Sequence, residues 1–483
     1  ANNIVDHGYP GDILRDGKSY DNHQLAPLGR PVAGDTFHAY FLAYFFIFFN
    51  FFIPGLTVMR SMFYYPVFIA ALSVLLVFLI ARRIAGNTGG FFAGLMMAVN
   101  SAFLGRTLFG HADSDAWVVF FPLLITWLFI ETMDAKSNLK VIIFSALAGF
   151  FTGLFTFAWN GWWYIFDFLI ATIGLTFLYL VFTNFGEIRR NIKFLYHNPT
   201  LRKIIIVGVI YFLSSVIFVT SFSSFDIFKN SFIGPLGFTS IKAPVLTLSL
   251  WPNVLTTVAE LNEGSLNGII NSVGGRFMFF ISLIGLALAI SRKEGLRKFD
   301  FFYILGTALF YVILFIRFGN DRPIFYETLS IIGVLIWIMI PLLLRIIISI
   351  YEKDQSYDFK LSILLSLWIV STIFASIKGI RFTLLLAPAF SVAFGVALGR
   401  SYTYISRLLT KELKIQKIIG SSILILLLIL AFYVGPTRGA INTSRSDIPI
   451  INDAWFNSLN SIKLDSKEDA IITSWWDFGH HFK

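Results

Sequence analysis

Residues 62–83 are MFYYPVFIAALSVLLVFLIARR, in which 20 residues without a charged side chain are followed by the pair Arg82-Arg83. About 20 apolar residues cross the hydrocarbon core of a bilayer as one helix, so this stretch predicts a membrane span. Basic residues are enriched in the cytoplasmic loops of membrane proteins. The arginine pair therefore predicts that the C-terminal end of this span faces the cytoplasm.

The rest of the chain repeats this pattern and predicts an all-α polytopic membrane protein. Of its 483 residues, 56% are hydrophobic and 14% are charged, whereas soluble domains carry about 25% charged residues. The sequence has no cysteine, so it predicts neither a disulfide framework nor a thiolate metal site. We predict about twelve spans, at residues 62–81, 89–104, 116–132, 140–157, 162–182, 203–222, 276–291, 299–317, 326–350, 360–377, 380–399 and 417–435.

Lys and Arg cluster in alternate loops between these spans, and the positive-inside rule places those loops in the cytoplasm. The basic clusters fall within residues 82–83, 136–140, 189–203, 292–298, 353–360 and 400–417. The net charge of +10 is thereby assigned to loops beside anionic lipid. We therefore expect these basic loops to contact membrane lipid, and we expect no nucleic acid among the partners of the protein.

This alternation divides the chain into three predicted parts. Residues 1–61 form a first external loop, in which the apolar stretch 37–53 lies in the membrane interface, because a crossing there would reverse the side of the N-terminal segment. Residues 62–435 form a transmembrane domain with a long external loop at 223–275. Residues 436–483 begin a mixed α/β extracytoplasmic domain.

The first polar group in the predicted external loops is Asp113-Ser114-Asp115, in the same loop as Arg106. Two carboxylates at positions i and i+2 point to the same side of an extended segment, where they can bind one hard divalent cation. The alternative is that Asp115 caps the helix that follows, since acids favour a helix N-terminus. The residues alone leave both interpretations open.

Two further charged residues lie in predicted external segments. Glu260 ends the run Thr257-Val258-Ala259-Glu260 in the long loop, where a lone glutamate is more often a solvated surface residue. Arg381 lies at the outer end of a predicted span. An arginine there commonly extends its side chain to the interface, but its guanidinium also matches phosphate oxygens in a bidentate way.

The sequence ends with an aromatic run, Trp475-Trp476-Asp477-Phe478-Gly479-His480, just after a strand-like segment at 470–473. One interpretation is a buried aromatic cluster of the outer domain. The other is a small pocket in which indole N–H donors and a carboxylate acceptor surround one hydroxyl group. A site of that kind rejects an analogue that lacks the hydroxyl.

Together these groups resemble motifs of the catalytic subunits of oligosaccharyltransferases (STT3 in eukaryotes, AglB in archaea, PglB in bacteria), and most of all archaeal AglB. The four matches occur in family order and cover essentially the whole chain. Residues 475–479 resemble the WWDYG motif with Phe for Tyr, residues 106–115 the second DxD motif, residues 257–260 the TIXE motif with Val for Ile, and residues 381–382 the arginine before a late span.

The resemblance implies a GT-C type membrane fold and an enzyme, a dolichyl-phosphooligosaccharide-protein glycosyltransferase. Such an enzyme transfers a glycan from a dolichyl-phosphate or -pyrophosphate carrier to Asn in Asn-x-Ser/Thr sequons, at the extracytoplasmic face of the cell membrane. It implies catalytic metal ligands at Asp113 and Asp115, with Mn²⁺ or Mg²⁺ as the cation, a catalytic Glu260 at the acceptor amide, phosphate binding by Arg381, and sequon binding by Trp475, Trp476 and Asp477.

Two departures from the family pattern bear on activity. The family's first membrane helix and first DxD motif have no counterpart here, and residues 1–10 resemble the segment just after that motif. We expect a further catalytic acid before residue 1 and most of the outer domain after residue 483, so this chain alone should be inactive. The alternatives are another GT-C lipid-phosphate-sugar transferase, such as a protein O-mannosyltransferase, and a polytopic transporter, which would carry ionisable residues inside its spans.

Overall fold

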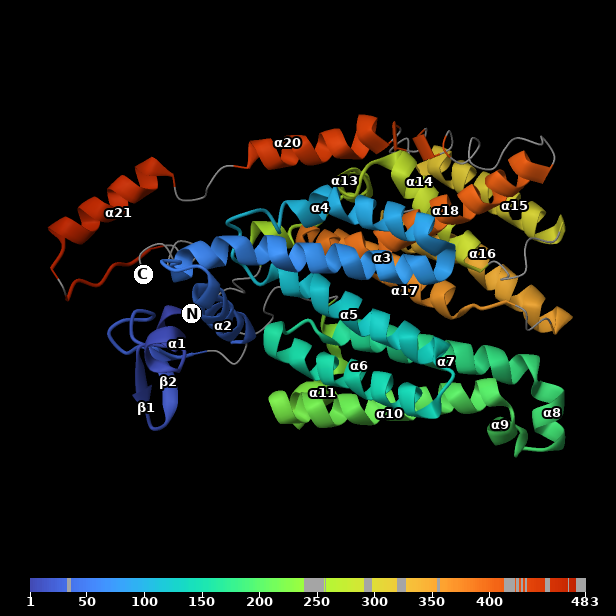
Figure 1. Cartoon of the computed structure of the whole chain (residues 1–483), viewed down its shortest axis with the longest axis horizontal. Coiled ribbons are helices and arrows are strands. Elements are labelled where there is room, and N and C mark those ends of the chain that lie inside the picture. Colours follow the sequence, from blue (N-terminus) through green and yellow to red (C-terminus); the bar gives the residue numbers. More distant parts are fainter. Residues whose placement is uncertain are drawn as a thin grey trace.

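The computed structural model describes the chain except for residues 33–35, 239–255, 257, 291–297, 319–326, 354–356, 412–421, 423–424, 427–428, 431, 448–451, 468 and 475–483. Its long helices lie side by side in one bundle. A small N-terminal sheet and the helix α2 (Phe37–Phe52) lie at one end of the bundle, whereas α8 (Phe185–Arg190) and α9 (Phe194–His197) lie at the opposite end (Figure 1).

The N-terminal segment folds as a three-stranded sheet that the sequence analysis did not predict. The helix α1 (Asn2–His7) precedes the strands β1 (Ile13–Arg15), β2 (Lys18–Asp21) and β3 (Arg30–Pro31), which pair antiparallel in the order β1-β2-β3. Asp16 and Gly17 join β1 to β2 with φ values of 50° and 75°, the geometry of a two-residue hairpin turn. The 16 residues of α2 are fewer than the roughly 20 that cross a bilayer, and its interfacial position stays a prediction.

The bundle confirms the predicted helical membrane fold. Its helices are α3 (Val58–Ala98), α5 (Asp115–Asp134), α6 (Asn138–Ala158), α7 (Trp163–Thr183), α10 (Pro199–Phe222), α14 (Arg276–Ala289), α15 (Lys298–Phe318), α16 (Glu327–Glu352), α17 (Lys360–Lys378) and α18 (Thr383–Lys411). Among the described residues, eight helices are long and apolar enough to cross a membrane, or nine if α14 and the preceding α13 (Leu266–Ser272), bent by 87°, form one span. The chain is thus an integral membrane protein. The total of about twelve spans stays a prediction, because 417–435 lies largely outside the described residues.

The helix α3 contains the first predicted span and the first ten residues of the second, because the chain reverses direction within it. Ala85 and Gly86 leave helical geometry, and Gly86 has a φ of 71°, which glycine adopts readily. A Cβ atom on Gly90 would lie 2.8 Å from the carbonyl oxygen of Phe78. Residues twelve apart in a continuous helix are about 18 Å apart, so the two arms must run antiparallel.

Some predicted boundaries differ from the structure. The second arm of α3 ends at Ala98, because Asn100 caps a new short helix, α4 (Ser101–Leu104). The helix α18 continues past the predicted end at 399, because the apolar run stops there but no helix-breaking residue follows. Residues 470–474 form no strand among the described residues, since a strand requires a pairing partner. The remaining elements are α11 (Phe225–Ser231), α12 (Gly234–Phe238), η2 (Ala259–Leu261), η3 (Ile380–Phe382), η4 (Tyr433–Thr437), α20 (Arg438–Ser446) and α21 (Asp453–Asp465).

Small residues bring α3, α14 and α18 into close contact at the centre of the bundle. A Cβ atom on Gly399 would lie 2.5 Å from the Cα atom of Gly89, and one on Gly285 would overlap the carbonyl group of Ala393. Association of helices in a membrane depends on such backbone approach, because lipid tails are as apolar as the side chains. These glycines fix the position of α18, which begins beside Arg381.

We predict that Gly285→Ala destabilises the protein, because the new methyl group meets the α18 backbone rather than a side chain that can move. Overpacking of this kind costs about 1–3 kcal/mol. The matched control is Gly174→Ala on α7, where a Cβ atom meets nothing within 4 Å. Thermal unfolding of the two variants in detergent should show a lower midpoint for Gly285→Ala alone; equal midpoints would contradict the packing.

Candidate active site

Four charged side chains from separate segments meet beside the first residue of α5. Asp115 is the first residue of α5, and Arg106 lies in the loop between α4 and α5. Glu260 lies in the short helix η2, and Arg381 lies in η3, between α17 and α18. The predicted alternative that Asp115 caps α5 is wrong, because Ser114 is the N-cap residue and the Asp115 carboxylate bonds to arginines instead.

The four side chains form a closed ring of ion pairs. Arg381 Nη2 donates to Asp115 Oδ1 at 3.0 Å, and Arg381 Nη1 lies 3.5 Å from Glu260 Oε2. Arg106 Nη2 donates to Glu260 Oε1 at 2.7 Å, and Arg106 Nη1 lies 3.4 Å from Asp115 Oδ2. Each arginine therefore contacts both acids, and the formal charges of the ring sum to zero.

Asp115 is the buried member of the ring. Its side chain is 3% exposed, whereas those of Arg106, Arg381 and Glu260 are 35%, 37% and 40% exposed. Leaving a buried carboxylate without its partner costs about 3–5 kcal/mol, and less where the partner is partly solvated, as here. The arginines therefore make it possible for a carboxylate to be buried at this position.

Backbone hydrogen bonds align the segments that carry Glu260 and Arg381. The N–H group of Ile380 donates to the carbonyl oxygen of Asn262, and that of Gly264 donates to the carbonyl oxygen of Ile377, each at 3.0 Å. A Cβ atom on Gly264 would lie 2.7 Å from the carbonyl oxygen of Ser376, so glycine permits this approach. The two segments are over a hundred residues apart in the chain and yet fixed in register.

Asp113 and Asp115 have the donor chemistry that a divalent cation needs. Asp115 Oδ2 is buried and accepts no hydrogen bond, and its contact with the chain is the 3.4 Å ion pair with Arg106, so this oxygen can still bind a further ligand. Asp113 is exposed, and its Oδ1 accepts from the backbone N–H of Ser114 at 2.6 Å. Carboxylate oxygens suit Mg²⁺ and Mn²⁺. The residues present thus fit such a cation.

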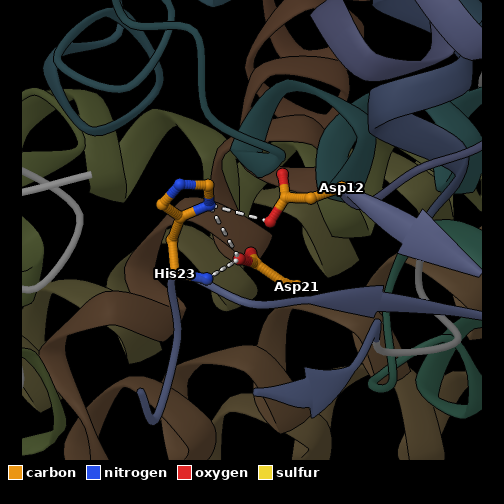
Figure 2. A group of neighbouring side chains, drawn as sticks. All are labelled: Asp12, Asp21 and His23. Atoms are coloured by element: carbon orange, nitrogen blue, oxygen red, sulfur yellow. Dashed lines mark hydrogen bonds and ion pairs between the residues drawn. The ribbon is translucent and has the colours of Figure 1, made fainter. Parts of the chain in front are cut away.

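A second group with metal-ligand chemistry lies in the N-terminal sheet, where Asp12, Asp21 and His23 face one another (Figure 2). Asp12 Oδ2 accepts from His23 Nδ1 at 2.8 Å and from the backbone N–H of Asn22 at 3.0 Å. Its Oδ1 accepts from Asn3 Nδ2 at 3.1 Å. Both oxygens of Asp12 are thus engaged by donors of the chain itself, so the group stabilises the turn after β2.

A pocket of about 740 Å³ lies beside Arg381. Its lining is largely aromatic and aliphatic and comes mainly from α7 and α17, with Trp163, Phe168, Phe374 and Leu385 among the residues. A guanidinium at the edge of an apolar pocket fits an amphiphile with an anionic head group.

The structure brings three residues singled out from the sequence, Asp115, Glu260 and Arg381, into direct contact. Asp113 lies two residues from the ring and points into its own loop. Trp475, Trp476 and Asp477 lie outside the described residues. Arg106 was noted in the sequence but given no role. The signal that identifies Arg106 is charge balance. Two carboxylates close together near a membrane require more than one positively charged side chain.

Comparison with known proteins places this geometry in a family. The family described as "Oligosaccharyl transferase STT3, N-terminal" matches residues 1–434. A dolichyl-phosphooligosaccharide-protein glycotransferase of Methanococcus voltae is 24% identical over 515 residues, covering 99% of this chain and 55% of that protein. The chain spans about half the length of the curated relatives that it matches.

Solved structures show the same fold. The archaeal oligosaccharyltransferase AglB from Archaeoglobus fulgidus, in complex with an inhibitory peptide and a dolichol-phosphate, matches with a TM-score of 0.56 at 16% identity, over 99% of this chain and 58% of that one. The Archaeoglobus fulgidus oligosaccharyltransferase in complex with Zn and sulfate matches with a TM-score of 0.52 at 15% identity, over 99% of this chain and 56% of that one. The predicted resemblance is confirmed.

The ring predicts a proximity that chemical cross-linking can measure. Because the chain has no cysteine, Arg106→Cys with Glu260→Cys introduces a single reactive pair, which a short bismaleimide should join in high yield. The control pairs Arg106→Cys with Asp134→Cys, at the far end of α5, about 28 Å along the helix from Asp115. Mass spectrometry of the linked peptides reads the result; equal yields in both variants would contradict the ring.

Proposed function

We propose that this chain, which belongs to the oligosaccharyl transferase STT3 family, acts in the N-glycosylation of other proteins. Its reaction is transfer of a glycan from a dolichyl-phosphate or dolichyl-pyrophosphate carrier to the side-chain nitrogen of Asn in an Asn-x-Ser/Thr sequon. The site lies on the extracytoplasmic face of the cell membrane, where the positive-inside rule puts the ring. The lipid-linked glycan and the acceptor polypeptide are its two substrates.

The observation that carries this proposal is the position of the charge ring at the edge of an apolar pocket. Arg381 belongs to both: it pairs with Asp115 and Glu260, and it lines the pocket. A polyprenyl chain suits the apolar lining, and a phosphate suits the guanidinium. The sugar carbon next to that phosphate is then close to the two acids.

The acceptor amide sets the chemical difficulty. Its nitrogen is a poor nucleophile, because the lone pair is delocalised into the carbonyl group. Glu260 accepts a hydrogen bond from the amide N–H and so favours a localised lone pair. Attack forms the N–C1 bond and breaks the bond from C1 to the phosphate oxygen with inversion. The electron pair of the broken bond leaves with the carrier phosphate, and one amide proton passes to the Glu260 carboxylate and from there to solvent.

Asp113 and Asp115 would hold the divalent cation in this proposal. When bound there, Mn²⁺ or Mg²⁺ would supply positive charge to offset the negative charge that develops on the departing phosphate. Asp115 Oδ2 accepts no hydrogen bond and is held only by the 3.4 Å ion pair with Arg106, which supports this assignment. Arg381 exchanges its contact with Asp115 for the phosphate of the carrier, and Arg106 remains to orient Glu260.

Sequon recognition is assigned to Trp475, Trp476 and Asp477. The ligand in this assignment is the hydroxyl group of the Ser or Thr two residues after the acceptor Asn. The indole N–H groups of the two tryptophans donate hydrogen bonds to this hydroxyl, and the carboxylate of Asp477 accepts one from it. The three residues lie outside the described part of the chain. The support for this assignment is therefore their resemblance to the family motif.

We predict that Asp113→Ala and Glu260→Gln each lower turnover about 100- to 1,000-fold, the usual cost of losing one preorganised electrostatic contact. The protein is expressed with the additional segments that its relatives carry, and glycopeptide formation is measured from a lipid-linked glycan. The control is Glu263→Gln, since Glu263 is 72% exposed and its 3.4 Å pair with Lys378 is a surface contact of little energy. Wild-type turnover in either test variant removes that residue from the mechanism.

A second prediction concerns the acceptor. Replacing Thr by Ala in the sequon of the peptide should lower kcat/KM at least about 100-fold, because the recognition pocket is left with unpaired polar groups. A Thr-to-Ser peptide keeps the hydroxyl and serves as the control. If the Ala peptide is glycosylated nearly as well as the Ser peptide, the assignment of Trp475 to Asp477 is wrong.

A further inference from the structure

The loop that carries Asp113 and Asp115 is held from behind by a histidine of α2. His38, the second residue of that helix, has its Nε2 atom 3.0 Å from the carbonyl oxygen of Ala112. Trp117 on α5 donates from its indole Nε1 to His38 Nδ1 at 3.1 Å. Because an indole N–H can only donate, His38 Nδ1 must accept, so Nε2 carries the proton and donates to Ala112. One neutral tautomer satisfies both contacts.

Burial supports this protonation state. It lowers the pKa of the His38 imidazole below its usual value, although the backbone contact at Ala112 and the nearby Asp113 act in the opposite direction. The neutral ring is the form that accepts from Trp117 and donates to Ala112.

A tyrosine of α3 holds the next peptide group of the same loop. The hydroxyl of Tyr65 donates to the carbonyl oxygen of Asp113 at 2.7 Å. Its ring is fully buried and packs against His38 and Trp117, with centroid distances of 5.0 Å and 5.5 Å. Three elements, α2, α3 and α5, therefore meet in one aromatic cluster directly behind the two acids.

We propose that His38 and Tyr65 are positioning residues that set the metal-binding geometry of Asp113 and Asp115 by fixing the carbonyl groups of Ala112 and Asp113. This inference rests on the proposed cation site. Two consecutive carbonyls held at fixed donors restrict the backbone angles between them, and hence the direction of the Asp113 side chain. Asp113 is exposed, and the hydrogen bonds of its carboxylate go to the adjacent Ser114, so the orientation of its side chain depends on the backbone.

The effect expected is on cation affinity. Groups that orient metal ligands from outside the coordination shell change affinity by about 10- to 100-fold when they are removed. His38→Phe keeps the ring and removes both hydrogen bonds, and Tyr65→Phe removes one hydroxyl group. His38→Gln supplies one donor and one acceptor again, so it should restore much of the affinity.

The test measures Mn²⁺ binding to the full-length protein without donor or acceptor, by electron paramagnetic resonance of the free ion. Binding that disappears in Asp113→Ala is assigned to this site, which separates it from the Asp12 group. We expect the Kd to rise about 10- to 100-fold in His38→Phe, to rise in the same direction in Tyr65→Phe, and to stay within a few-fold of wild type in His38→Gln. The packing control is Phe41→Leu, since Phe41 lies 4.5 Å from the Trp117 ring centroid and its side chain has no donor.

Each outcome decides the question. If wild type binds Mn²⁺ at this site and both His38→Phe and Tyr65→Phe bind it equally well, the positioning role is overturned while the cation site stands. If Phe41→Leu weakens binding as much as His38→Phe, packing alone explains the effect and the inference is overturned. Absence of saturable Mn²⁺ binding in wild type overturns the proposed cation site, and the inference fails with it. Should His38→Phe not fold, the isosteric Tyr65→Phe decides alone.

Discussion

The buried carboxylate of Asp115 is the constraint on which the rest of the site depends. A charge that is 3% exposed at the end of a helical bundle is stable only with cationic partners, and the chain supplies Arg106 and Arg381 from segments 9 and 266 residues away. Glu260 then balances the second positive charge. The bundle, the short backbone ladder at Asn262 to Gly264 and the glycine contacts of α18 all serve to bring these segments to one place.

The same ring explains how the site changes state in the proposed reaction. With no substrate bound, the two arginines neutralise the two acids. A phosphate group that binds Arg381 and a metal cation that binds Asp115 each compete with the ion pair between these two residues. Either ligand therefore weakens this ion pair, and the residue that is released becomes free to bind the other ligand. Coupling between two ligands is reciprocal by thermodynamic necessity. Binding of the cation and of the lipid phosphate should therefore be mutually favourable.

Much of this was predictable from the sequence, for identifiable reasons. Apolar runs of about 20 residues ended by Lys and Arg located the helices, and motif resemblance located Asp115, Glu260 and Arg381. The sheet at the N-terminus was missed because its strands are three, four and two residues long, although Asp16-Gly17 is a strong hairpin signal. The brace formed by His38 and Tyr65 was not predictable, because it uses backbone carbonyls, which carry no sequence signal. The buried ion pair between Arg345 and Asp300 was not predictable either, because the two residues lie on different helices, α16 and α15. Their side chains are 1% and 5% exposed and lie 3.0 Å apart.

The most direct test of the account is to locate the cation. Crystals of the full-length protein grown with Mn²⁺ give an anomalous difference map at the manganese absorption edge, which shows the ion independently of activity. The account predicts a peak against the carboxylates of Asp113 and Asp115, with Asp115 Oδ2 as a ligand. A map with no peak there, and manganese only beside Asp12, Asp21 and His23, would contradict it.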